Sequence, residues 1–246
     1  MVKQKNNRNP YIASGTEHPL SILANQAYQA FADMGFEIAL GPEMESEWYN
    51  FDVLNMPKDH PARDMQDTFW IKNTPGKVLR THTTGVTAWA TEQAAKKGRM
   101  PSAFISVGKV FRNEATDATH EMQFFQIDGS MLGAVEDGVS LAHMKAILTN
   151  FYKKMLGDDV EIEFRPSFFP FTEPSIEVFA KFKGKWLEMM GGGMTNPAVI
   201  RNMGLDPQKY QGFCFGGGLD RIAMIKWGIP DVRLFYQGDL RLNQIQ

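Results

Sequence analysis

The chain has 246 residues, of which 43% are hydrophobic and 22% are charged, and its formal net charge is -2. These values are typical of a globular protein with one large core, and they exclude a general electrostatic attraction to nucleic acid. No stretch approaches the roughly 20 apolar residues of a membrane span, and no apolar run follows the basic opening residues as in a signal peptide. The single cysteine, Cys214, excludes an internal disulfide and favours the reducing cytoplasm.

We expect residues 1–16 to form a flexible lead and residues 17–246 to form one domain. Apolar residues recur at helical spacing from His18 to the stop signal at Gly35, and a short strand is predicted over 36–40. Residues 45–64 contain two X-Pro steps and several aromatic residues, which predicts an irregular loop with a function. Paired strands are predicted over 67–72 and 78–81.

The next predicted helix ends at Gly98 and begins with His82, Thr83 and Thr84. Hydroxyl groups at the start of a helix most often cap it. We therefore favour capping over ligand binding for these two threonines.

A polar loop, 113–120, joins two predicted strands, 103–112 and 121–132. Side chains alternate between the faces of a strand, so Phe124, Gln126 and Asp128 are expected to share one face. Together with the basic and acidic residues near the loop, they suit a ligand with phosphates, a flat ring and an ammonium group. The alternative is an edge hairpin with a solvated tip.

The second half of the chain predicts a helix over 139–156, then strands over 160–165, 176–182 and 212–215, and a helix over 219–227. Because these strands follow one another through short turns, we predict an α+β fold with an antiparallel sheet and helices packed on it. The phenylalanines around Pro170 fit either a core or the wall of an apolar pocket. Arg221 lies in a first helical turn, where a cation is disfavoured. A bound polyanion would offset this, as would a salt bridge to Asp220 or Glu188.

Several motifs, in order, resemble those of class II aminoacyl-tRNA synthetases. The segments F-R-N-E, D-A-T-H and F-x-Q resemble motif 2, G-G-G-L-D-R resembles motif 3, and the helix and strand up to Pro42 resemble motif 1. The segments H-P-A-R-D-M-Q-D-T-F-W, L-R-T-H-T, R-P-S-F-F-P-F-T-E-P-S and I-P-D-V-R-L-F-Y-Q-G-D-L-R resemble the phenylalanyl-tRNA synthetase alpha-subunit family. The resemblance covers residues 17–241. It implies a catalytic domain over 17–246 that joins an amino acid, phenylalanine above all, to ATP as an adenylate and then to tRNA.

For the nucleotide, the resemblance implies that Arg112 clamps the α-phosphate and that Phe124 stacks under adenine. Glu114 takes the adenine amino group, Arg221 covers the other face of the ring near the γ-phosphate, and His120 meets the outer phosphates. The other implied nucleotide and Mg²⁺ positions are Gly216 and Gly218 for ATP and Glu188 for the metal ion.

For the amino acid, the resemblance implies a site made of an ammonium end and a ring end. The residues implied at the ammonium end are His82, Thr84, Gln126 and Asp128; those at the ring end are Phe169, Phe171 and Cys214, the last at the pocket floor. Members of that family usually carry serine, glutamine, histidine, glutamate and alanine where this chain has Thr84, Thr87, Phe125, Asp128 and Cys214. Asp128 therefore has a shorter reach, and Cys214 makes the pocket shallower.

The resemblance also implies partners. The family's alpha subunit has an N-terminal arm that contacts tRNA and works with a beta subunit in an (αβ)2 assembly, and the motif 1 helix offers a homodimer interface. Two other functions stay open. One is a paralogue that activates a different amino acid or uses an acceptor other than tRNA; the other is a catalytically inactive binding or regulatory module.

Overall fold

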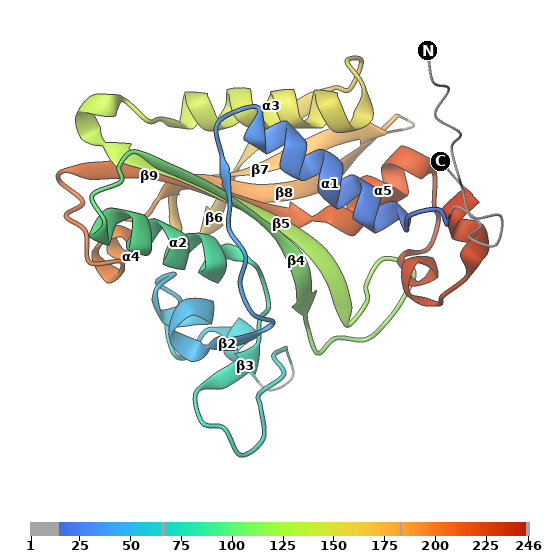
Figure 1. The fold of residues 1–246 in the computed structure, drawn as a ribbon, viewed down its shortest axis with the longest axis horizontal. Coiled ribbons are helices and arrows are strands. Elements are labelled where there is room, and N and C mark those ends of the chain that lie inside the picture. Colours follow the sequence, from blue (N-terminus) through green and yellow to red (C-terminus); the bar gives the residue numbers. More distant parts are fainter. Residues whose placement is uncertain (1–14, 65–66, 183, 245–246) are drawn as a thin grey trace, which may run out of the picture.

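A computed structural model describes residues 15–64, 67–182 and 184–244, which form a seven-stranded sheet with helices on both faces (Figure 1). Of the lead expected over residues 1–16, positions 1–14 lie outside the described residues. Across the sheet the strands are β1 Glu37–Ile38, β4 Ser102–Phe111, β5 Gln123–Ala134, β9 Tyr210–Gly218, β8 Lys185–Thr195, β7 Thr172–Phe182 and β6 Ile162–Phe169. Only β1 pairs in parallel within this sheet, with β4. The predicted α+β class with an antiparallel sheet is thereby confirmed.

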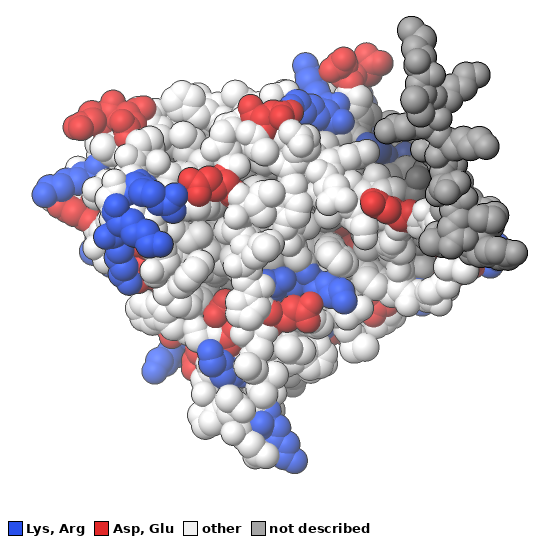
Figure 2. All heavy atoms as spheres, in the orientation of Figure 1, with Lys and Arg blue, Asp and Glu red and all other residues white. Residues whose placement is uncertain are grey.

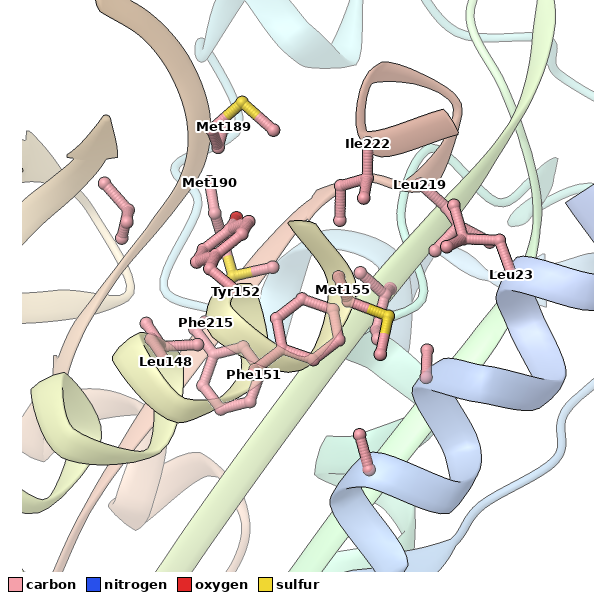
Figure 3. Close-up of a cluster of buried hydrophobic side chains, with 14 of the residues drawn as sticks. Leu23, Leu148, Phe151, Tyr152, Met155, Met189, Met190, Phe215, Leu219 and Ile222 are labelled. Atoms are coloured by element: carbon pink, nitrogen blue, oxygen red, sulfur yellow. The ribbon is translucent and has the colours of Figure 1, made fainter. Parts of the chain in front are cut away.

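Three long helices cover one face of the sheet, which we call the helix face: α1 Pro19–Ala32, α3 Leu141–Leu156 and α5 Leu219–Trp227 (Figure 1). Their buried side chains form the main core, with Tyr152 of α3 pointing toward Met190 of β8 and Leu219 of α5 pointing toward Leu23 of α1 (Figure 3). Phe31 of α1 stacks on Phe215 of β9 with ring centroids 5.5 Å apart. The amphipathic pattern of each helix is explained by this shared core.

The helix boundaries follow local capping signals. His18 caps α1, since its Nδ1 accepts the Leu20 N–H, and Pro19 occupies the first helical position, where no N–H is needed. α5 ends at Gly228, whose φ of 66° is a left-handed conformation that glycine adopts without strain. The predicted helix 219–227 is confirmed with the same ends, and the predicted helix 139–156 is confirmed with a start two residues later.

Phe31→Ala is expected to lower the free energy of unfolding by about 3–5 kcal/mol, since it removes a fully buried ring and leaves a cavity. The lost ring contacts Phe36, Phe151 and Phe215. Urea unfolding measures the change. Phe168→Ala is the matched control, because that ring is 83% exposed and its removal should change stability by less than about 0.5 kcal/mol.

The opposite face of the sheet carries six glycines, and we call it the glycine face: Gly108, Gly191, Gly193, Gly212, Gly216 and Gly218. α2 Thr84–Lys96 and α4 Pro197–Asn202 lie on this side (Figure 1). The predicted helix that ends at Gly98 is confirmed as α2.

The pairing expected between 67–72 and 78–81 is confirmed in part: Trp70 forms an antiparallel bridge to Val78, and Leu79 N–H donates to the Phe69 carbonyl oxygen. β3 Lys77–Leu79 pairs in addition with β2 Met44–Ser46, a strand inside the segment predicted as an irregular loop. Short helical turns do occur in that loop. The short helices of the chain are η1 Trp48–Asp52, η2 Pro61–Arg63, η3 Val135–Asp137, η4 Val232–Tyr236 and η5 Leu240–Gln244.

Among the described residues, no helix has the length and apolar character needed to cross a bilayer. Acidic and basic side chains intermingle over the face seen in Figure 2, with no broad region of a single sign. This distribution agrees with the net charge of -2 and leaves any contact with nucleic acid to local groups.

Candidate active site

Strand register brings the polar candidates together on the glycine face. In one row across the sheet Asp128 of β5 lies between Ser106 of β4 and Gly216 of β9. In the next row Gln126 lies between Gly108 and Gly218, and Phe124 follows opposite Val110. Residues opposite each other in antiparallel strands point to the same side. The predicted common face for Phe124, Gln126 and Asp128 is therefore confirmed.

Asp128 lies at the centre of this face and is 2% exposed. Its Oδ2 accepts the Thr83 N–H at 3.2 Å and the Thr83 hydroxyl, and its Oδ1 accepts the Thr84 hydroxyl at 2.6 Å. The two threonines thus bind a carboxylate of the sheet, and Thr83 makes no side-chain cap. Our expectation that these hydroxyls cap α2 is wrong.

Glycine at position 216 is required by the Asp128 carboxylate, because a Cβ there would lie 2.0 Å from Oδ1. Burial raises the pKa of Asp128, against the opposing effect of the hydrogen bonds from Thr83 and Thr84 and the positive charge of Arg112. A carboxylate has about four lone-pair positions, and three donors occupy three of them. One acceptor position on Oδ1 is left for a ligand.

Two more acceptor atoms belong to this region. Gln126 Oε1 and His82 Nδ1 are buried without a hydrogen-bond partner in the described structure. His82 lies next to Thr83, and its Nε2 is 2.9 Å from the Asn50 carbonyl oxygen, so Nε2 carries the proton and Nδ1 is a bare acceptor. Unpaired buried acceptors are costly unless a ligand pairs with them.

His82 is neutral at physiological pH. Burial, together with the charges of Arg112 and Arg80, lowers its pKa from 6.5 to about 4. Neutral imidazole can accept a hydrogen bond, whereas the protonated ring would repel an ammonium group.

Between pH 6.5 and pH 4 the unfolded chain binds a proton at His82 that the folded chain does not, so acid favours unfolding. His82→Gln removes this linkage. We expect the stability advantage of the wild type over His82→Gln to shrink by about 2 kcal/mol from pH 7 to pH 5. Urea unfolding at both pH values measures it, and an advantage that stays constant contradicts the buried neutral histidine.

Arg112 directly follows β4, and its guanidinium carbon lies 5.1 Å from the centre of the Phe124 ring. The guanidinium interacts electrostatically with the carboxylates of Glu114, Asp128 and Asp67. Arg112 is exposed. Phe124 is half-buried. An exposed guanidinium above an aromatic ring can bind an anion through the N–H groups at its edge. A second flat ring can join the same stack.

Arg221, in the first turn of α5, donates from Nη1 to the main-chain carbonyl oxygen of Glu188 at 2.7 Å. No salt bridge of the described residues includes Arg221, so the alternative of an ion pair with Asp220 or Glu188 is wrong. The guanidinium keeps donors available for a ligand, because it has five and one is used here.

Glu188 is exposed beside this contact, and the described residues contain no group of three or more metal-ligating side chains. A single carboxylate does not make a preformed metal cage. It does fit Mg²⁺, which is commonly held by one or two carboxylates together with substrate phosphates and waters.

His120 and Glu114 belong to the loop between β4 and β5. Nδ1 of His120 lies 3.0 Å from Asp117 Oδ1, and the Asp117 carboxylate also accepts the N–H groups of Thr119 and His120. These bonds hold the pKa of Asp117 well below its usual range. His120 is half exposed at the tip of this loop, away from the row that contains Asp128.

The aromatic candidates Phe169 and Phe171 stack on each other with centroids 5.5 Å apart. The Phe169 ring covers Gly191 on the glycine face, where a Cβ would lie 2.6 Å from it. Phe171 packs instead against the cluster that includes Val53 and Val199.

Thr84 and Cys214 line one small cavity of about 20 Å³, and burial raises the pKa of the Cys214 thiol to about 12. The same cavity is lined by Thr87, which our sequence interpretation named only as a departure from the family, and by Thr91, which it missed. They recur at helical spacing after Thr84, and that stripe of hydroxyls on an otherwise alanine-rich helix was the available signal.

Arg80 is another missed residue. It is 5% exposed, donates to the carbonyl oxygens of Lys109 and Gly41, and fills the space above Gly108. It fixes the end of β4 before Arg112. A separate hollow of about 530 Å³, lined by Phe69, Phe111 and Tyr236 among others, is lined by none of the candidate residues.

The family model for the class II core domain of tRNA synthetases (F) matches residues 4–245. Phenylalanine–tRNA ligase alpha subunits of Bacillus mycoides and Bacillus cytotoxicus are each 45% identical to this chain over 245 residues, which is 95% of this chain and 69% of theirs. The pyrrolysyl-tRNA synthetase of Desulfitobacterium hafniense shares the fold with a TM-score of 0.72 at 19% identity, covering 89% of this chain and 73% of that one. The chain therefore belongs to the class II tRNA synthetase family and, within it, to the phenylalanine–tRNA ligase alpha subunits.

Proposed function

We propose that the chain activates phenylalanine with ATP and passes it to tRNA, as the names of its relatives state for those proteins. One observation carries this proposal. Arg112 lies over the Phe124 ring at one end of the hairpin, where it can bind an anion. Gln126 and Asp128, two and four residues after Phe124, lie on the same face and can accept hydrogen bonds from an ammonium group. The two reactants of an adenylate-forming reaction thus have adjoining sites.

The nucleotide lies at the hairpin end of the glycine face. Phe124 stacks under adenine, Glu114 accepts the adenine amino group, and Arg112 holds the α-phosphate. Arg221 and His120 bind the outer phosphates from α5 and from the hairpin loop. Gly218 leaves the sheet surface low, since a Cβ there would meet no atom within 4 Å, whereas Gly216 contributes to the site by making room for the Asp128 carboxylate. Mg²⁺ would be held by Glu188 and would neutralise phosphate charge.

The ammonium group of the amino acid has three N–H donors, and three acceptor atoms match them: the remaining position on Asp128, Gln126 Oε1 and His82 Nδ1. Thr84 orients Asp128 rather than meeting the ligand directly. The aromatic side chain points toward the Phe169–Phe171 stack and the cavity lined by Thr84 and Cys214. The cavity leaves little room beyond that ring, which favours phenylalanine over an amino acid whose ring carries a further substituent.

In the reaction, an oxygen of the amino-acid carboxylate attacks the α-phosphorus of ATP and the bond to the β-phosphate bridging oxygen breaks. Pyrophosphate leaves with that electron pair. Arg112 contacts both the carboxylate and the α-phosphate, so it aligns the reacting atoms and stabilises the added charge of the transition state. A hydroxyl of the tRNA terminal adenosine then takes the acyl group and releases AMP. No covalent nucleophile of the protein is needed.

The domain over 17–246 is the catalytic unit in this proposal, and its setting is cytoplasmic. Its relatives are named as alpha subunits, which supports a beta subunit as a partner. Either an (αβ)2 assembly or a homodimer through α1 is compatible with that name.

ATP–pyrophosphate exchange with each amino acid tests the proposal, with the chain alone and with a beta subunit from a relative. Exchange with phenylalanine alone supports it. Exchange with another amino acid supports the paralogue, and exchange with none supports the inactive module. The presence of Arg112, Glu114, His120 and Arg221 together weighs against that module.

A further inference from the structure

Asp220 is a buried carboxyl group that the proposed reaction does not use. It lies in the first turn of α5, directly before Arg221, and is 3% exposed. Its Oδ2 accepts the Phe125 N–H at 2.6 Å, and its Oδ1 accepts the Tyr236 hydroxyl at 2.7 Å. Both contacts reach elements distant in sequence, so the carboxylate ties three parts of the fold together.

The contact with Phe125 replaces a missing strand. β5 pairs with β9 only as far as Gln126 opposite Gly218, where β9 ends and α5 begins. The next N–H of β5 on that side has no strand partner, and Asp220 accepts it in place of a β9 carbonyl. Phe125 stands between Phe124 and Gln126, so the bond holds the stretch of β5 that faces both proposed ligands.

The contact with Tyr236 brings in the segment after α5. The backbone of η4 makes two other hydrogen bonds. The Val232 N–H donates to the Ala118 carbonyl oxygen of the hairpin loop, and the Phe235 carbonyl oxygen accepts from His18 Nε2 at the start of α1. Burial, with the nearby charge of Asp220, raises the pKa of the Tyr236 hydroxyl, which therefore stays a donor. η4 thus connects the hairpin loop, α1 and Asp220.

Burying the Asp220 carboxyl group is unfavourable, so its presence in the core points to a specific role. Desolvation raises the pKa of Asp220 from 3.8 to about 7, against the effect of its hydrogen bonds. A carboxyl that served only to fill space would be replaced at lower cost by an apolar side chain.

We infer that Asp220, with Tyr236 as its second anchor, is a positioning residue that sets Arg221 against the Arg112–Phe124 end of the nucleotide site, and that η4 is part of that site's support. The inference rests on the proposed ATP site. It assigns no contact with substrate to Asp220 or Tyr236. Its main consequence falls on the nucleotide: loosening the tie moves the two arginines relative to each other and weakens ATP binding. Of the acceptors for the ammonium group, Asp128 is held by the two threonines at the start of α2 and His82 by the Asn50 carbonyl oxygen, so these two keep their places.

Tyr236→Phe is the decisive variant, since it removes one hydroxyl and keeps the ring. Tyr28→Phe is the control: that hydroxyl donates to the Val107 carbonyl oxygen at 2.9 Å and accepts the Val107 N–H at 3.2 Å, and it has no contact with Asp220. Titration calorimetry of the full chain with ATP measures affinity, exchange kinetics give KM for ATP and for the amino acid, and thermal unfolding gives stability. We expect Tyr236→Phe to weaken ATP binding about 10-fold and to change KM for the amino acid by less than about 3-fold, and Tyr28→Phe to leave both unchanged at a comparable loss of stability.

Asp220→Asn should retain part of the affinity, because an amide oxygen can accept the Phe125 N–H, whereas Asp220→Ala should lose more than Tyr236→Phe. Equal effects of Tyr236→Phe and Tyr28→Phe on ATP binding overturn the inference, as does a parallel rise of both KM values. A wild type that binds ATP but exchanges with no amino acid overturns the proposed function alone, and the ATP affinities still decide the inference. A wild type that binds no ATP overturns both.

Discussion

Arg112→Lys is expected to lower kcat of ATP–pyrophosphate exchange by at least about 100-fold, which corresponds to about 2.7 kcal/mol of lost transition-state stabilisation. Lysine keeps the charge but loses the planar fork that can hold a carboxylate oxygen and a phosphate oxygen together. It also loses the stack over Phe124, where the guanidinium carbon is 5.1 Å from the ring centre. Because Arg112 is exposed, the variant should unfold at nearly the wild-type urea concentration.

The matched control is Arg99→Lys. Arg99 lies on the surface in an ion pair with Glu37, and its replacement should leave exchange unchanged. Steady-state and single-turnover kinetics separate binding from chemistry in both variants. If Arg112→Lys raises KM for ATP and leaves kcat unchanged, Arg112 binds the ground state and does not select the transition state.

The hairpin that carries Arg112 could be predicted from the sequence because its signals are local. Strand alternation depends only on neighbouring residues, so the shared face of Phe124, Gln126 and Asp128 followed from the pattern alone. α5 was equally accessible, since its start after three glycines and its end at Gly228 are both marked by residue type. For these parts, local preference and tertiary packing agree.

The role of Thr83 and Thr84 could not be predicted in the same way. A hydroxyl at a helix start normally bonds to the backbone of its own helix. Here a buried carboxylate 44 and 45 residues away competes for both hydroxyls, and it wins because its charge would otherwise be buried with fewer donors. No local pattern encodes that competitor. The tie between Asp220 and Tyr236 was missed for a related reason, since it depends on where β9 stops pairing with β5.

The same limit explains why the pairing of β3 with β2 was not predicted. Val78 has a branched side chain in a short run with strand preference, which the sequence displays, but its strand partner Glu45 lies in a segment with prolines and capping residues. Strand pairing over more than thirty residues is decided by burial of Val78, which is fully buried, rather than by the residues nearest in the chain.

Asp128→Asn is expected to raise KM for the amino acid by about 100-fold and to change KM for ATP by less than about 3-fold. If the asparagine oxygen accepts the Thr83 N–H, its NH2 group must take the place of Oδ1 on the Thr84 side. In the wild type that oxygen has a lone pair left for the ligand. A donor then faces the donors of the ammonium group. The favourable pairing of the Asp128 carboxylate with the ammonium group is lost as well. The substitution therefore weakens binding of the amino acid and leaves the nucleotide site unchanged.

The stability of Asp128→Asn shows whether the variant binds the amino acid poorly because a contact is lost or because the chain is less stably folded. Burial raises the pKa of Asp128, so at pH 8 the folded chain holds an ionised carboxylate that the unfolded chain solvates better. Asparagine removes that cost, and the free energy of unfolding at pH 8 should not fall. Glu136→Gln, an exposed carboxylate just past β5, is the control with no expected effect. Equal rises of KM for ATP and for the amino acid would show that Asp128 shapes the whole sheet surface, whereas a rise confined to the amino acid assigns Asp128 to the ammonium group.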